Sequence, residues 1–174
     1  MTDGCLYLRL LPFFAAIELG SGCGTAGLAL SSFGARVLCT DLASVLPHLA
    51  ANIAANVTRI QPVGGEALSA PYAWGTPLGP LETSPDGVPW EVIILSDVAY
   101  HRDLFEPLVR SLLALTEQRG SVIYQSHLHR FKAERHYWHA VKRHFAVENV
   151  FEYPVTGERR AVICVFKLVR HARR

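Results

Sequence analysis

The stretch Phe13-Phe14-Ala15-Ala16-Ile17-Glu18-Leu19-Gly20-Ser21-Gly22-Cys23-Gly24 decides the fold of this chain. A short apolar run ends in an acid and is followed by three glycines at alternate positions, which predicts a buried parallel strand and then a tight turn. Glycine has no β-carbon, so the backbone can turn sharply and a ligand can approach it closely. A helix is expected to begin near Thr25, and free N–H groups at a helix start favour a ligand that carries a carboxylate or phosphate.

The spacing of the glycines indicates which ligand is expected. The dinucleotide fingerprint is G-x-G-x-x-G, whereas Gly20, Gly22 and Gly24 form G-x-G-x-G, with Thr25 where the third dinucleotide glycine belongs. An NAD-linked oxidoreductase is therefore disfavoured. On this motif alone, a glycine-rich turn without any ligand remains an alternative.

An acid ends the next predicted strand, which covers residues 36–41. Asp41 follows Gly20 by 21 positions, where a nucleoside-binding α/β unit places a carboxylate that accepts hydrogen bonds from the ribose hydroxyls. The alternative role for Asp41 is that of an acid at a helix N-terminus. Its distance from the glycine turn favours ribose binding.

Composition limits the class of protein. A chain of 174 residues predicts one domain over 1–174, and a net charge of +2 predicts no strong attraction to nucleic acid. Its four cysteines form no C-x-x-C pair, which suits a reducing compartment, so a cytoplasmic or also nuclear location is expected. Arg9 and Pro12 interrupt the apolar run at 6–17, which therefore predicts a core strand rather than a membrane span or signal peptide.

The rest of the chain alternates between strand and helix patterns. Strands are predicted at 61–68, 90–97, 121–125, 146–153 and 161–168, and a loop is predicted at 69–89. Helices are predicted at 25–33, 46–57, 104–115 and 131–145. A capping box of Asp103 and Glu106 is predicted to open the third of these helices. Together with the first two strands, this order predicts an α/β fold. The expected architecture is a Rossmann-like seven-stranded, mostly parallel sheet with helices on both faces and a C-terminal antiparallel hairpin.

Polar residues at one strand end and a tryptophan in a loop add to the candidate site. Ser96, Asp97 and Tyr100 follow the buried strand 90–97, at the sheet edge where open α/β folds bind ligands. Trp74 lies in the Pro- and Gly-rich loop, where it either covers the core or stacks on an adenine ring.

Five histidines crowd one region, at positions 127, 129, 136, 139 and 144. No pair has the i, i+4 spacing of a zincin helix, no acid–histidine pattern is evident, and no cysteine lies nearby. Solvated faces of a basic helix are the favoured interpretation, and no metal site is predicted. The chain also lacks a G-x-S-x-G nucleophile elbow and a Walker lysine.

Four segments in order resemble a known family: ELGSGCG at 18–24, TDL at 40–42, AWG at 73–75 and SDVAY at 96–100. Together they are similar to the S-adenosylmethionine-dependent, seven-strand protein-lysine methyltransferases of family 16, relatives of the calmodulin, chaperone and elongation-factor lysine methyltransferases. The resemblance runs from about residue 13 to residue 168. The first motif is shared by many methyltransferases, whereas the step from Asp97 to Tyr100 and the Trp-Gly pair narrow the resemblance to this group.

The resemblance implies roles for individual residues. Asp97 and Tyr100 would be catalytic residues at the mouth where the methyl group meets the substrate. Asp41 would bind the ribose, Trp74 would lie against the adenine, and Glu18 would lie at the base of the methionine pocket. The implied S-adenosylmethionine-binding set is Glu18, Gly20, Ser21, Gly22, Gly24, Asp41, Trp74 and Ser96.

The implied activity is methyl transfer to a lysine side chain of a protein substrate, such as a chaperone or a translation factor. A monomer with no nucleic-acid or membrane partner is expected. Family members usually carry a further segment before the first motif, so a shortened domain is expected here. The alternatives are a methyltransferase for a small molecule or another side chain, and a catalytically silent binding module.

Overall fold

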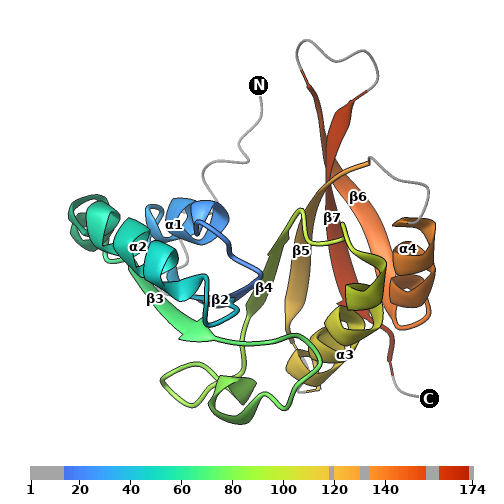
Figure 1. The fold of residues 1–174 in the computed structure, drawn as a ribbon, viewed down its shortest axis with the longest axis horizontal. Coiled ribbons are helices and arrows are strands. Elements are labelled where there is room, and N and C mark those ends of the chain that lie inside the picture. Colours follow the sequence, from blue (N-terminus) through green and yellow to red (C-terminus); the bar gives the residue numbers. More distant parts are fainter. Residues whose placement is uncertain (1–13, 118–119, 130–133, 156–160, 173–174) are drawn as a thin grey trace. The chain divides into compact units, whose positions relative to one another are not determined.

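The computed structural model describes residues 14–117, 120–129, 134–155 and 161–172. Its seven strands form one sheet in the order β3-β2-β1-β4-β5-β7-β6 (Figure 1). The chain divides into two compact units, Met1–Tyr72 with Trp90–Ile94 and Ala73–Pro89 with Leu95–Arg174. Within the described residues, none of the helices is long and apolar enough to cross a membrane.

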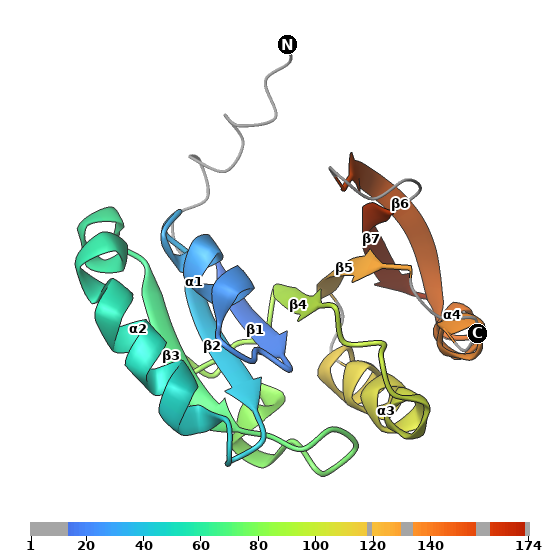
Figure 2. The ribbon, with the colours of Figure 1, turned by 45° about the horizontal axis from the view of Figure 1, so that its top comes forward.

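The first unit contains three parallel strands and two helices (Figure 2). The strands are β1 (Ala15–Leu19), β2 (Arg36–Asp41) and β3 (Glu66–Pro71), and the helices are α1 (Thr25–Ser31) and α2 (Leu46–Ile60). Every residue of β1 is buried, as expected for an apolar strand covered on both sides. Its core combines small and branched side chains, and the fully buried members are Ala16, Ala35, Val37, Cys39 and Leu49.

The prediction of a strand at 61–68 is wrong for the first half of that range. Gln61–Val63 instead forms a 3₁₀ turn that continues α2, and Gly64 ends it with a φ of 77°, a conformation that favours glycine. Strand β3 then runs on to Pro71, into the segment predicted to be a loop. The remainder of that loop contains a 3₁₀ turn at Gly79–Glu82, and its Leu81 is buried.

The second unit ends in the predicted antiparallel hairpin. Strands β6 (Phe145–Pro154) and β7 (Val162–Arg170) pair antiparallel, and β7 pairs antiparallel with β5 (Val122–Leu128). Helices α3 (Phe105–Leu115) and α4 (Glu134–Lys142) belong to the same unit, while strand β4 (Val92–Ser96) contributes residues to both. The α/β class, the seven strands and the terminal hairpin are thus confirmed.

Two helix predictions in this unit need correction. Asp103 does not cap α3, because it lies in a 3₁₀ turn at Arg102–Leu104 and no side-chain hydrogen bond caps the helix. The helix predicted to reach residue 145 ends at Lys142, and Phe145 already begins β6. An apolar residue at helical spacing can equally start a strand, which explains the error. The predicted start at 131–133 lies outside the described residues.

A buried side-chain hydrogen bond fastens α4 to β5. The Tyr137 hydroxyl donates to Gln125 Oε1 over 2.6 Å, and both side chains are fully buried. Burial raises the pKa of Tyr137 well above its ordinary value, so the phenol stays protonated and remains a donor.

We therefore expect Tyr137→Phe to lower the free energy of unfolding by roughly 1–3 kcal/mol, because it leaves Gln125 Oε1 buried without a donor. Chemical denaturation measures this change. Tyr124→Phe is the control, since Tyr124 lies on β5 and is 38% exposed; its change should stay within about 0.5 kcal/mol. Equal effects of the two substitutions would show that the buried hydrogen bond contributes nothing.

Candidate functional site

Three left-handed glycines shape the turn between β1 and α1. Gly20, Gly22 and Gly24 have φ values of 69°, 54° and 82°, a region that favours glycine over residues with a β-carbon. A β-carbon at Gly22 would meet no atom of the described residues within 4 Å, so this position is open in the described part of the chain. A β-carbon at Gly24 would come within 2.6 Å of the Leu49 side chain. The outer part of the turn is therefore open to a ligand, and its inner part packs closely against α2.

Most backbone donors of this turn are already used. The N–H groups of Gly20 and Ser21 both donate to the Thr40 carbonyl, at 2.9 and 3.0 Å, and Gly24 N–H donates to the Ser21 carbonyl at 2.7 Å. The buried Ser21 hydroxyl is directed inward, 3.4 Å from the Glu18 carbonyl. These three N–H groups are thus used within the protein, and the predicted role of N–H groups at the start of α1 stays a prediction. The turn fits a ligand that packs against the glycine backbone.

Asp41 joins the turn to the end of β2. Its Oδ2 accepts a 2.7 Å hydrogen bond from Gly22 N–H, and its Oδ1 accepts one of the same length from Leu42 N–H. These bonds fix the carboxylate beside the glycine turn. A carboxylate has about four lone-pair sites, so acceptor capacity remains on both oxygens. Two residues that are distant in sequence but were both predicted for the site, Gly22 and Asp41, are therefore in direct contact.

Glu18 lies behind the turn. Its side chain is buried, and Oε2 accepts a 3.0 Å hydrogen bond from Gly27 N–H in the first turns of α1. A β-carbon at Gly27 would come within 2.6 Å of that oxygen and 2.4 Å of Cys39 Sγ, so glycine is required for this close packing. Glu18 thus supports the turn from inside. Burial raises the pKa of its carboxyl above the ordinary 4.5, and it raises the pKa of the neighbouring Cys39 thiol to about 12.

The raised pKa of Glu18 predicts a pH-dependent stability. Because the folded state favours the protonated carboxyl, the stability that Glu18 contributes is fully present below pH 4.5 and is lost as pH rises through the folded-state pKa. Glu18→Gln removes this titration. We expect the free energy of unfolding of the wild type, relative to Glu18→Gln, to fall between pH 4.5 and neutral pH in urea denaturation. A difference that does not change with pH would contradict this prediction.

In the second unit, the Trp74-Gly75 turn is fixed against α3. Gly75 N–H donates to Ser111 Oγ over 2.8 Å, and its φ is 81°. A β-carbon there would come within 3.0 Å of the Pro107 backbone. The backbone at position 75 lies so close to α3 that only glycine fits there, and this contact fixes the chain next to the half-buried Trp74.

The polar residues after β4 form a second fixed group. Asp97 N–H donates to the Ser126 carbonyl of β5 over 3.0 Å, and the Ser126 hydroxyl donates to Ser96 Oγ over 3.1 Å. Ser96 is exposed, Asp97 is half-buried, and the Tyr100 side chain is 59% exposed. Hydrogen bonds to β5 therefore hold the strand end, and Tyr100 is left accessible to a substrate.

Asp97 has an unusual backbone. Its φ of 56° is the only positive value among the described residues other than glycine. Aspartate tolerates this left-handed conformation better than most residues, yet it costs about 1–2 kcal/mol. Strained residues of this kind cluster at functional sites, where the surrounding structure holds them in place. This backbone is an independent reason to regard Asp97 as functional.

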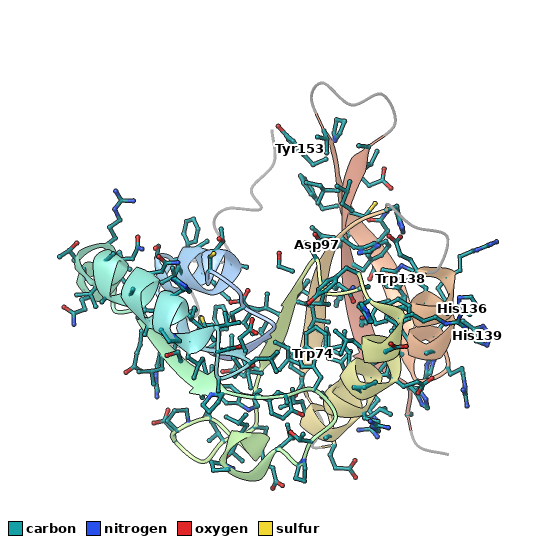
Figure 3. The ribbon with its side chains drawn as sticks, in the orientation of Figure 1. Trp74, Asp97, His136, Trp138, His139 and Tyr153 are labelled. Carbon is teal, nitrogen blue, oxygen red and sulfur yellow. The ribbon has the colours of Figure 1, made fainter. Side chains whose placement is uncertain are left out.

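The predicted residues fall into two fixed groups. Gly20, Ser21, Gly22 and Gly24 lie in the first unit with Glu18 and Asp41. Trp74, Ser96, Asp97 and Tyr100 lie in the second unit, and Figure 3 labels Trp74 and Asp97. Within the first group the structure brings the glycine turn and Asp41 together. Within the second it brings Ser96 and Asp97 against the same residue of β5.

One cluster of polar side chains was not predicted from the sequence. His127 is buried rather than solvated, and its Nε2 lies 3.0 Å from Glu134 Oε2, which is also 3.2 Å from His129 Nδ1. The strand was predicted to end at residue 125, whereas β5 continues to Leu128 and carries His127. The short H-x-H spacing directly after the predicted strand was the available signal. The prediction that the histidines lie on a solvated helix face is confirmed for His136 and His139, which are exposed on α4 (Figure 3).

Comparison with known proteins identifies related sequences. The family described as "Lysine methyltransferase" matches residues 11–144. The chain is 29% identical over 153 residues to the protein-lysine N-methyltransferase EFM6 of Saccharomyces cerevisiae, covering 81% of this chain and 60% of that protein. It is 27% identical to the protein N-lysine methyltransferase METTL21A of Xenopus tropicalis, covering 84% and 66%. The EEF1A lysine methyltransferase 3 of the same organism is 28% identical, covering 77% and 56%. The chain thus spans less than two thirds of the length of these relatives.

Solved structures share the fold. A S-adenosylmethionine-dependent methyltransferase from Methanosarcina mazei superposes with a TM-score of 0.67 at 12% identity, covering 97% of this chain and 98% of that one. The magnesium protoporphyrin IX methyltransferase of Synechocystis, solved with bound S-adenosylmethionine, gives a TM-score of 0.58 at 16% identity and covers 95% and 76%. At these identities the likeness shows a common fold.

Proposed function

The chain belongs to the lysine methyltransferase family, and from this premise we propose that it transfers a methyl group from S-adenosylmethionine to a lysine side chain of a protein substrate. The observation that carries the proposal is the 2.7 Å hydrogen bond between Gly22 N–H and Asp41 Oδ2. It joins the open glycine turn to the acid that would accept from a ribose, two features that a nucleoside ligand needs side by side.

The residues of the first unit fit S-adenosylmethionine. Gly22 faces open space, so the methionine part can pack against the backbone there, and Asp41 keeps acceptor capacity for ribose hydroxyls. The internal hydrogen bonds of the turn leave few donors for a pyrophosphate, which favours a nucleoside with a sulfonium side chain over a dinucleotide. Trp74 would cover the adenine. When bound, S-adenosylmethionine supplies an electrophilic methyl group for in-line displacement.

The residues after β4 would handle the lysine. A free lysine has a pKa of about 10.4 and must be neutral to act as a nucleophile. Asp97 would accept a hydrogen bond from the amine and orient its lone pair, while the accessible Tyr100 would provide an aromatic and hydroxyl wall. Neither residue need act as a general base, since a neighbouring positive charge and exclusion of water both lower the pKa of an amine.

The choice of partner follows from the relatives. One of them is named as a lysine methyltransferase of EEF1A, and this supports a translation factor as the substrate of this chain. A chaperone substrate rests on the sequence resemblance alone. We propose that the protein acts as a monomer in the cytoplasm, or also in the nucleus. The net charge of +2 supports a protein substrate rather than a nucleic acid.

The test has two stages. Calorimetric titration of the full chain with S-adenosylmethionine should give micromolar binding, with no response to NAD. Incubation with S-adenosylmethionine carrying a labelled methyl group and with cell extract should then label proteins, and mass spectrometry should locate the label on lysine. Label confined to small molecules would support the alternative substrate class. Absence of cofactor binding would support a silent binding module.

A further inference from the structure

Two histidines and a glutamate converge in the second unit, outside the residues assigned to methyl transfer. The donor atoms are His127 Nε2, His129 Nδ1 and Glu134 Oε2, which all lie within 4.8 Å of one another. His127 lies on β5, and His129 follows one residue after the strand ends at Leu128. The two imidazole rings contact each other edge to face, with ring centroids 4.8 Å apart. Glu134 is the first residue of α4, and its carboxylate reaches both imidazoles.

The chemistry of this set suits a divalent transition metal. Imidazole nitrogen and carboxylate oxygen are ordinary zinc ligands, and His₂Glu with one open position is a known zinc arrangement. At metal–ligand distances of about 2.0–2.2 Å, tetrahedral ligand atoms lie about 3.3–3.6 Å apart. The two nitrogen–oxygen separations of 3.0 and 3.2 Å are slightly shorter than this range. Only the two nitrogens need to approach each other.

Burial restrains the side chains of His127 and Glu134, whereas the exposed side chain of His129 can change its position. His127 and Glu134 are 2% and 4% exposed, and the Trp138 ring packs edge-on against His127 at a centroid distance of 5.5 Å. The His129 side chain is 53% exposed and lines a hollow together with Trp138 and Phe166. That hollow gives an ion a path of entry, and it leaves room for water as the fourth ligand.

Glu134 contributes a buried carboxylate to the cluster. A buried carboxylate favours a nearby positive charge, and a divalent cation bound by the three donor atoms would supply it.

We propose that His127, His129 and Glu134 form a site for a divalent transition metal such as Zn²⁺, which ties the start of α4 to strand β5. Arg135 and Lys142 line the same hollow and repel a dication, so the affinity is micromolar rather than nanomolar. The site is independent of the proposed methyl transfer.

The test uses the full chain, stripped of metal with a chelator, in a Cys23→Ser background that removes an exposed thiol. Titration with Zn²⁺ should give one saturable site. His129→Ala, at an exposed position, should weaken binding at least about 100-fold, and so should Glu134→Gln. The control is the double variant His136→Ala/His139→Ala, which removes exposed histidines of α4 and should bind Zn²⁺ like the parent.

A second readout locates the ion. Co²⁺ should quench the fluorescence of Trp138, and the quenching should disappear in Trp138→Phe and in His129→Ala. The proposal is overturned if the parent binds no Zn²⁺ at about 100 μM, which would leave a hydrogen-bonded cluster without metal. It is equally overturned if His129→Ala and Glu134→Gln bind as the parent does, or if the α4 double variant alone loses binding.

Discussion

Replacing Gly22 with valine should abolish S-adenosylmethionine binding while the fold persists. The new side chain would project into the open space that the ligand is proposed to fill, where an added β-carbon meets no atom of the described residues within 4 Å. The folded protein would bear only the strain of a φ of 54°, about 1–2 kcal/mol. Gly22 N–H would still donate to Asp41. Calorimetry should therefore show no heat of binding, and circular dichroism should show a folded protein with a lowered melting temperature.

Gly79 offers a matched control for this prediction. It has the same φ of 54°, and a β-carbon there also meets no atom within 4 Å, but it lies in the 3₁₀ turn Gly79–Glu82 outside the candidate site. Gly79→Val should lower the melting temperature as Gly22→Val does and leave the affinity for S-adenosylmethionine unchanged. If both substitutions abolish binding, the loss is due to destabilisation. If neither does, the glycine turn is not the cofactor site.

Features with a local cause could be predicted from the sequence. The apolar run at 13–17 predicts a buried strand because parallel strands are covered on both sides, and every residue of β1 is buried, Glu18 included. The order of strand and helix patterns likewise predicts the sheet and its terminal hairpin. Boundaries were less predictable. Gln61 follows a helix and is itself compatible with helix or turn, and only the left-handed Gly64 shows where the chain leaves the helical path.

Features that depend on tertiary contacts could not be predicted. The residue types of Asp41 and Gly22 indicated a nucleoside site, but their direct hydrogen bond depends on how β2 pairs with β1. The Thr40 carbonyl of the neighbouring strand accepts hydrogen bonds from the N–H groups of Gly20 and Ser21, and this contact likewise depends on strand pairing. Glu134 follows His127 by seven positions, which is no recognised ligand spacing. Their contact arises because α4 returns to β5.

The second large effect is expected at Asp97, the aspartate with the left-handed backbone. Asp97→Asn should reduce methyl transfer by roughly 10- to 150-fold, because a hydrogen bond to a charged group is worth about 1.5–3 kcal/mol. Asparagine tolerates a φ of 56° as well as aspartate does, so the fold should be retained. The affinity for S-adenosylmethionine should stay nearly unchanged. Labelled-methyl transfer under saturating cofactor, together with calorimetry, measures the two quantities separately.

A glycine at position 97 distinguishes the effect of the carboxylate on activity from the effect of the backbone conformation on stability. Asp97→Gly relieves the left-handed strain, so the free energy of unfolding should stay the same or rise by about 1 kcal/mol. Its activity should nevertheless fall at least as far as that of Asp97→Asn, since both lack the carboxylate. A variant that is more stable yet less active would mean that the aspartate is kept at a cost in stability because of its chemistry. Full activity of Asp97→Asn would instead contradict the assignment of Asp97 to the substrate mouth. The strained backbone of Asp97 would then have no catalytic explanation.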